Sequence, residues 1–176
     1  PGDAGNWFAK KRSTLGAVLT LTAPGIPMLF QGQEFLEDQF FDDQQPLDWS
    51  KSETYNGIVK MYTDLTSLRL NRTGVTKGLT GQGIAITHLN DVHKVFAYHR
   101  WADGGPSDSV VVLINFSQRA LENYVVAFPQ AGLWQVRFNS DSDVYDTEFD
   151  NHGTAAITAT ASEDNSAQGV IHLGPY

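Results

Sequence analysis

The period of the hydrophobic residues changes once along this chain, close to Gly74, and that change constrains the fold strongly. Before it, apolar residues recur at helical spacing over residues 6–22 and 55–72, which predicts two amphipathic helices. After it, short segments alternate with a period of two, and we expect strands at residues 84–89, 92–101, 109–116, 124–128, 133–139, 155–160 and 169–173. The sequence therefore predicts an α/β part over residues 1–74 and an antiparallel β-sandwich over residues 75–176.

Between the two predicted helices lies a continuously apolar run, residues 26–30. Pro24 and Gly25 must end the first helix, because proline lacks the amide proton of the next helical hydrogen bond. A short apolar run between turn signals predicts a strand buried on both faces, as in a parallel sheet. Residues 32–52 are rich in acidic and amide side chains, and a loop of this length is usually functional or disordered.

Turn residues separate the predicted strands. Asn90-Asp91 is expected to form a hairpin turn, and Gly104-Gly105-Pro106 marks a second turn. The first residue is Pro1 instead of methionine and no signal peptide follows, so we expect the chain to be an excised segment.

Charge and composition restrict the partners. The net charge of −8 disfavours nucleic acid and acidic membrane surfaces, while neutral ligands remain open. The chain has no cysteine, which excludes disulfides and cysteine-based chemistry. No apolar run approaches the roughly 20 residues that a membrane helix requires, so neither a membrane nor a nucleic acid is an expected partner.

Three separated motifs carry a resemblance to a known family. Residues 23–35, APGIPMLFQGQEF, resemble the eighth barrel strand of the α-amylase superfamily and the Gly-x-Glu segment after it. Residues 46–49, PLDW, resemble the end of this loop in glucan-branching enzymes. Residues 138–142, together with Tyr145, resemble a turn in the C-terminal β domain of those enzymes.

The resemblance implies a fold and an activity. Residues 1–74 would be the last helix, strand and helix of a (β/α)₈ barrel, and residues 75–176 the α-amylase-type C-terminal domain packed on it. A complete barrel takes about 250 residues, so the rest of the barrel, or another copy of the chain, is the expected partner of the lone strand. The family uses a nucleophilic aspartate, a general-acid glutamate and a second aspartate. These come from earlier barrel strands, so no catalytic residue is expected in this chain, which should be inactive alone.

The parent enzyme implied by the resemblance is a cytoplasmic 1,4-α-glucan branching enzyme acting on glycogen or starch. An α-amylase-like hydrolase and a non-catalytic glucan-binding module are the alternatives. New α-1,6 linkages from amylose would indicate branching, whereas new reducing ends would indicate hydrolysis.

Four residues are candidates for contacts with sugar. Gln33 and Glu34 follow the predicted strand, where barrel enzymes build the rim of their sites, so they are expected to line or brace a glucan groove. The alternative for Glu34 is a turn cap or a structural ion pair. Trp101 and Trp134 could stack on glucose, although most tryptophans of a β-sandwich belong to its core.

No cofactor and no metal site are expected. Asn139, Asp141 and Asp143, with Asp150 further on, alternate like a calcium loop. The run lacks the glycine and the bidentate glutamate of such a loop, so a side-chain-bonded turn is expected.

The other charged residues are expected to be structural. The basic run at residues 10–12 should face solvent on the first helix, and the acids of the 32–52 loop should be solvated instead of forming a catalytic pair. His88 and His93 could meet across the hairpin, where cross-strand packing is expected before metal binding.

Overall fold

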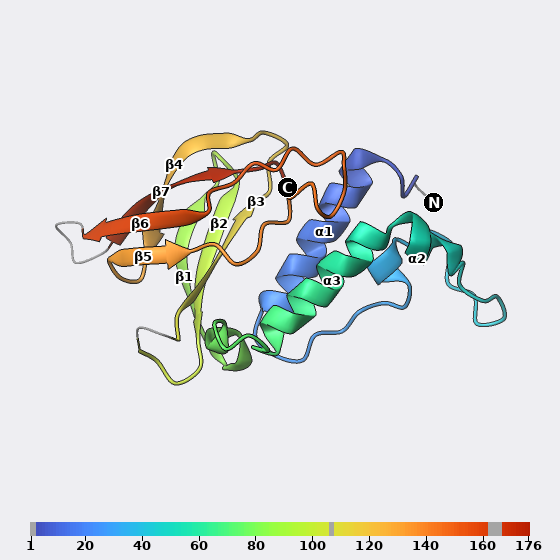
Figure 1. The fold of residues 1–176 in the computed structure, drawn as a ribbon, viewed down its shortest axis with the longest axis horizontal. Helices are drawn as coiled ribbons and strands as arrows, with labels where there is room; N and C mark the ends of the chain where they lie inside the picture. The colour runs from blue at the N-terminus through green and yellow to red at the C-terminus, as the bar shows by residue number, and fades with distance from the viewer. Residues whose placement is uncertain (1–2, 106–107, 162–166) are drawn as a thin grey trace.

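The computed structural model describes residues 3–105, 108–161 and 167–176. It places the helices on one side of the molecule and two β-sheets on the other (Figure 1). The helices are α1 (Trp7–Thr22), η1 (Gln33–Phe35), α2 (Ser50–Thr54), α3 (Asn56–Arg69) and η2 (Lys77–Thr80). The strands are β1 (Gly83–Asn90), β2 (Val95–Trp101), β3 (Val110–Asn115), β4 (Leu121–Phe128), β5 (Gly132–Gln135), β6 (Ala156–Ala161) and β7 (Ala167–Leu173). A helical region followed by antiparallel strands is confirmed.

The strands form two antiparallel sheets, in the orders β1-β2-β3 and β4-β7-β6-β5. An apolar core lies between them, because Ala97 of β2 packs with Val126, Phe128, Ile157 and Ile171 of the second sheet. The hairpin predicted at residues 90–91 is present, with Asn90 paired to Val95. In the second predicted turn Gly104 and Gly105 have positive φ angles, while Pro106 lies outside the described residues.

The helices share a second core with the first sheet. The side chain of Asn6 caps α1 by accepting a hydrogen bond of 2.9 Å from the amide of Phe8. The buried apolar residues of this core include Leu15, Val18 and Leu21 of α1, Ile58, Met61 and Leu65 of α3, and Tyr98, Val112 and Ile114 of the sheet. Across the described ranges, no helix is long and apolar enough to cross a membrane.

The buried strand predicted at residues 26–30 does not form. This segment is neither helix nor strand, and Ile26 and Met28 are 98% and 87% exposed. The reason is that a buried parallel strand needs hydrogen-bonded neighbours on both sides, and in the described part of the chain no strand lies beside it. The structure therefore has a helical N-terminal part where the sequence predicts an α/β part.

The solvent exposure predicted for the basic run at residues 10–12 is wrong for two of its three residues. Lys11 is fully buried, and its Nζ donates a hydrogen bond of 2.6 Å to Asp141 Oδ1. Lys10 donates to Asp146 at 2.7 Å and to Glu148. Only Arg12 is exposed. The acidic loop after β5 covers this face of α1, so the two lysines join the helix to the β domain.

Two arginines hold the end of α1. Arg100 of β2 is fully buried and donates to the carbonyl oxygens of Gly81 (2.6 Å), Gly83 (3.0 Å) and Thr22. Arg69 of α3 donates to the carbonyls of Ala23 and Gly25. Basic side chains at a helix C-terminus donate hydrogen bonds to its free carbonyls, and their positive charge interacts favourably with the negative end of the helix dipole. The C-terminal end of α1 is therefore held by one residue of the helical part and one residue of the β domain.

Candidate functional site

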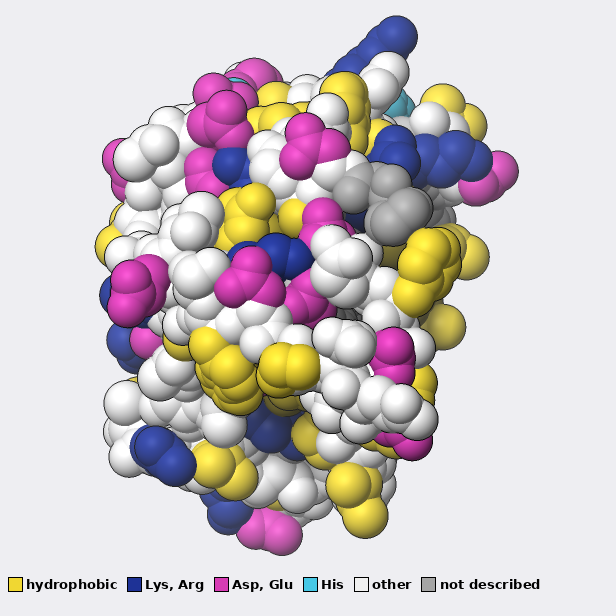
Figure 2. Space-filling view, turned by 90° about the vertical axis from the view of Figure 1, so that its right-hand side faces the viewer, with side chains coloured by type: hydrophobic (Ala, Val, Ile, Leu, Met, Phe, Trp, Pro, Cys, Tyr) yellow, Lys and Arg dark blue, Asp and Glu magenta, His cyan; other side chains and the backbone are white. Residues whose placement is uncertain are grey.

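The loop from Gly32 to α2 projects from the helical end of the molecule, and Figure 2 looks onto this end. Gly32 begins the turn with φ of 83°, and a Cβ there would lie 2.6 Å from Cβ of Glu37. Glycine is therefore required for both backbone conformation and space. Gln33 and Glu34 follow on η1, half-buried, and Gln33 Oε1 accepts a hydrogen bond of 3.2 Å from the amide of Phe30.

Glu37 ties the two ends of this loop together. Its carboxylate accepts hydrogen bonds from Lys51 Nζ (2.6 Å) and from the amides of Gln39 (3.0 Å) and Asp48 (2.9 Å). The hydrogen bond from Lys51 is the main cause that lowers the pKa of Glu37 to about 2, against the cost of desolvation. Asp38 also accepts from Lys51. These two acids are thus structural anions, and they form no acid and base pair.

A cavity of about 320 Å³ lies between α1 and this loop. It is lined by Ala4, Ala9, Ser13, Phe30, Gln33, Leu36, Glu37 and Asp38. Glu34 does not line it, and within the described ranges it makes neither a side-chain hydrogen bond nor an ion pair. Neither the sugar contact nor the structural alternatives for Glu34 receives support here, so its rim role stays a prediction.

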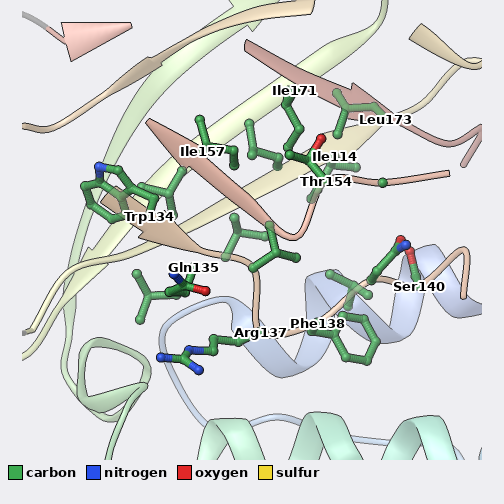
Figure 3. A pocket seen from close by; sticks show the side chains of 18 of the residues that line it. Ile114, Trp134, Gln135, Arg137, Phe138, Ser140, Thr154, Ile157, Ile171 and Leu173 are labelled. Carbon is green, nitrogen blue, oxygen red and sulfur yellow. The ribbon is translucent and has the colours of Figure 1, made fainter. Parts of the chain in front are cut away.

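The two candidate stacking tryptophans are both half-buried in the β domain. The indole of Trp101 lies on Gly83, where a Cβ would come within 2.3 Å of the ring, and its centroid is 4.9 Å from that of His99. Trp134 donates from Nε1 to the carbonyl of Gln130 at 3.2 Å. It lines a cavity of about 400 Å³ between the sheets and α1, with Trp134 at one end and Ser140 at the other (Figure 3).

The structure does not bring the four candidates into one groove. Gln33 and Glu34 lie on η1 next to α2, whereas Trp134 lies on β5 at the opposite end of the molecule (Figure 1). A sugar bound at η1 and a sugar stacked on either tryptophan would therefore occupy separate sites.

The run that alternates like a calcium loop is a side-chain-bonded turn, as predicted. Asp141 Oδ1 accepts a hydrogen bond from Lys11 Nζ. Asp141 Oδ2 accepts from the amide of His152 at 2.9 Å and lies 3.0 Å from Nδ1 of the same histidine. The side chain of Asn139 caps the amide of Asp141 at 3.1 Å. No cluster of three or more potential metal-ligating side chains occurs among residues 3–105, 108–161 and 167–176.

His88 and His93 both contact Tyr124 of β4. Their ring centroids lie 5.5 and 5.6 Å from that of Tyr124, and His88 Nε2 is 2.8 Å from its hydroxyl. Desolvation lowers the pKa of His88. Both histidines thus contact the second sheet through Tyr124, His88 from β1 and the exposed His93 from the turn that follows it.

The fold and these contacts define a class: a two-sheet antiparallel β domain fastened to a helical segment by buried ion pairs. The profile described as "Alpha amylase, C-terminal all-beta domain" matches residues 86–175. The chain belongs to this family.

Several full-length proteins resemble this chain. It is 31% identical to the 1,4-alpha-glucan branching enzyme GlgB of Pseudomonas fluorescens (strain Pf0-1) over 99% of the chain and 24% of that protein. It is 30% identical to GlgB 1 of Rhizobium johnstonii over 82% of the chain and 20% of that protein. The chain thus spans between a fifth and a quarter of the length of these curated relatives.

A solved structure has the same fold. The gamma-CGTASE from alkalophilic Bacillus clarkii superposes with a TM-score of 0.64 and 18% identity. The superposition covers 98% of this chain and 23% of that one, so the likeness includes the helices as well as the sheets.

The residues that hold the loop between Gly32 and α2, and the end of α1, in place were not predicted from the sequence. Lys51 and Glu37 are 14 positions apart, and nothing local indicates that they pair. Arg100 gave a usable signal, because it is a charged residue within the otherwise largely apolar strand VFAYHRW. A charged residue in such a strand indicates a buried hydrogen-bonding role.

Proposed function

We propose that this chain is the C-terminal part of a glucan-branching-type transglycosidase acting on α-1,4-glucan such as glycogen or starch. The observation that carries the proposal is the similarity to branching enzymes over 99% of the chain at 31% identity. The three ordered motifs of the sequence support the same assignment. The cytoplasmic location stays a prediction.

The catalytic carboxylates are proposed to lie in the part of the relatives that this chain does not cover. In a retaining glycosidase the two carboxyl groups are about 5–5.5 Å apart, and one of them must keep its proton so that it can act as the general acid. Glu37 and Asp38 share Lys51, so they do not meet that requirement. The chain alone is accordingly proposed to be inactive.

The β domain is proposed to brace the barrel, with residues 1–74 as the barrel part and 75–176 as the brace. Support comes from the buried contacts across residue 74: Lys11 with Asp141, and Arg100 with the carbonyl of Thr22. Such contacts hold α1, and with it the segment that leads to Gln33 and Glu34. Those two residues are proposed to line or brace the glucan groove.

The test is a chimera in which this chain replaces the matching C-terminal segment of the Pseudomonas fluorescens relative. With amylose as substrate, we expect new α-1,6 linkages without a matching rise in reducing ends. A rise in reducing ends with the chimera, where the intact relative gives none, would indicate that the chain comes from a hydrolase instead. The chain by itself, and the relative truncated before the segment, serve as controls and should both be inactive. A folded chimera without transfer activity would contradict the proposal.

A further inference from the structure

The loop at the helical end carries an unusual number of exposed aromatic rings. Phe40 is 79% exposed, and Phe41 and Trp49 are each 63% exposed. Hydrophobic side chains are interspersed with acidic, basic and other side chains over this end of the molecule (Figure 2). Exposed aromatic groups on a loop that the structure holds in place are typical of a binding surface.

Trp49 is held rigidly while most of its ring stays open. Its ring packs on the buried Phe35, with centroids 5.1 Å apart and planes tilted by 44°. The preceding amide, of Asp48, donates to Glu37 Oε2 at 2.9 Å. The Asp48 side chain accepts hydrogen bonds from the amide (3.1 Å) and the hydroxyl (2.6 Å) of Ser50, the first residue of α2. The ring therefore needs little ordering when a ligand binds to its exposed part.

The charges around Trp49 select the kind of ligand. No lysine or arginine occurs between residues 13 and 50, and Lys51 is engaged by Glu37 and Asp38. The exposed polar side chains of the loop are carboxylates and amides, namely Gln39, Asp42, Asp43, Gln44, Gln45 and Asp48. An anionic ligand would be repelled. Carboxylate and amide oxygens accept hydrogen bonds from hydroxyl groups, so a neutral polyhydroxyl ligand fits this surface.

We propose that Trp49 is a stacking platform for one glucose unit of an α-glucan chain, with the adjacent Asp48 carboxylate accepting a hydrogen bond from a sugar hydroxyl. A pyranose presents an apolar face to an indole and hydroxyl groups at its edge. The choice of α-glucan rests on the proposed function, whereas the position and the chemistry of the platform come from the loop itself.

The test is affinity electrophoresis of the whole chain in gels containing amylose, with titration of maltoheptaose for the dissociation constant. An aromatic contact of about 0.5–1.5 kcal/mol corresponds to roughly a 2- to 12-fold change. We expect Trp49→Ala to weaken binding within that range and Trp49→Tyr to retain most of it. Phe116→Ala, which removes another exposed aromatic ring, in the β domain, is the matched control and should bind like the unaltered chain.

The outcomes separate this inference from the proposed function. Unchanged retention of Trp49→Ala, or no retention of the unaltered chain, overturns the platform even where the chimera branches amylose. Retention that depends on Trp49 supports the platform even where the chimera is inactive. Tetramethylammonium serves as a competing cation, added at the same molar concentration as the sugar-binding sites. If it releases the chain from amylose, the aromatic rings and carboxylates of the loop bind cations, and the sugar assignment is overturned.

Discussion

Removing the buried cation of Lys11 should destabilise the protein strongly. The side chains of Lys11 and Asp141 are 0% and 3% exposed and are joined at 2.6 Å. Lys11 Nζ also lies 4.6 Å from the ring centroid of Phe149. Loss of one partner leaves an uncompensated buried charge, which costs about 3–5 kcal/mol. Two hydrogen bonds from His152 remain on Asp141, so we expect Lys11→Met to cost about 3 kcal/mol.

Urea unfolding of the whole chain at pH 8 measures this loss as a shift of the midpoint at constant m-value. Lys77→Met is the matched control, because its ion pair with Asp103 is exposed, and no measurable change is expected there. The double variant Lys11→Met with Asp141→Leu should be less destabilised than the sum of the two single changes. A loss for Lys11→Met no larger than that for Lys77→Met would refute the reasoning.

Three further predictions concern the helical part. Glu37→Gln should cost about 2 kcal/mol at pH 7. Because the pKa of Glu37 falls from 4.5 to about 2 on folding, unfolding curves should show this difference shrinking as the pH falls through that interval. Gly57→Ala should cost about 2–3 kcal/mol in urea unfolding, since its Cβ would lie 2.0 Å from the carbonyl oxygen of Tyr145, whereas Gly16→Ala, with no atom within 4 Å, should be tolerated. Ile26→Ser should change the free energy of unfolding of this chain by no more than about 0.5 kcal/mol, but it should lower the transfer activity of the chimera. A large loss of stability in the chain alone would be inconsistent with the exposure of Ile26.

The β domain was predictable because its signal is local. Alternation of apolar and polar residues depends only on which face of a strand is buried, so all seven strands were predicted close to their observed positions. The two long helices were predictable for the same reason. The local pattern therefore predicts which face of each long helix and each strand is buried, without knowledge of the distant residues that cover it.

The errors concern interactions between distant segments. Residues 26–30 have the composition of a buried strand, but a strand also needs neighbours, which the segment's own sequence cannot supply. Lys11 was expected in solvent, and its partner Asp141 lies 130 positions away. The candidate site was predicted in part, because Gln33 and Glu34 could be placed on the loop, whereas the link from Glu37 to Lys51 and the exposure of Trp49 required the structure.

The most direct test of this account is the ratio of new α-1,6 linkages to new reducing ends when the chimera acts on amylose. If this chain forms the last quarter of a branching-type enzyme, linkages should greatly exceed reducing ends, and Lys11→Met should lower the yield by unfolding the brace. Reducing ends in excess of linkages, from a folded chimera and under conditions in which the intact relative forms linkages, would contradict the assignment.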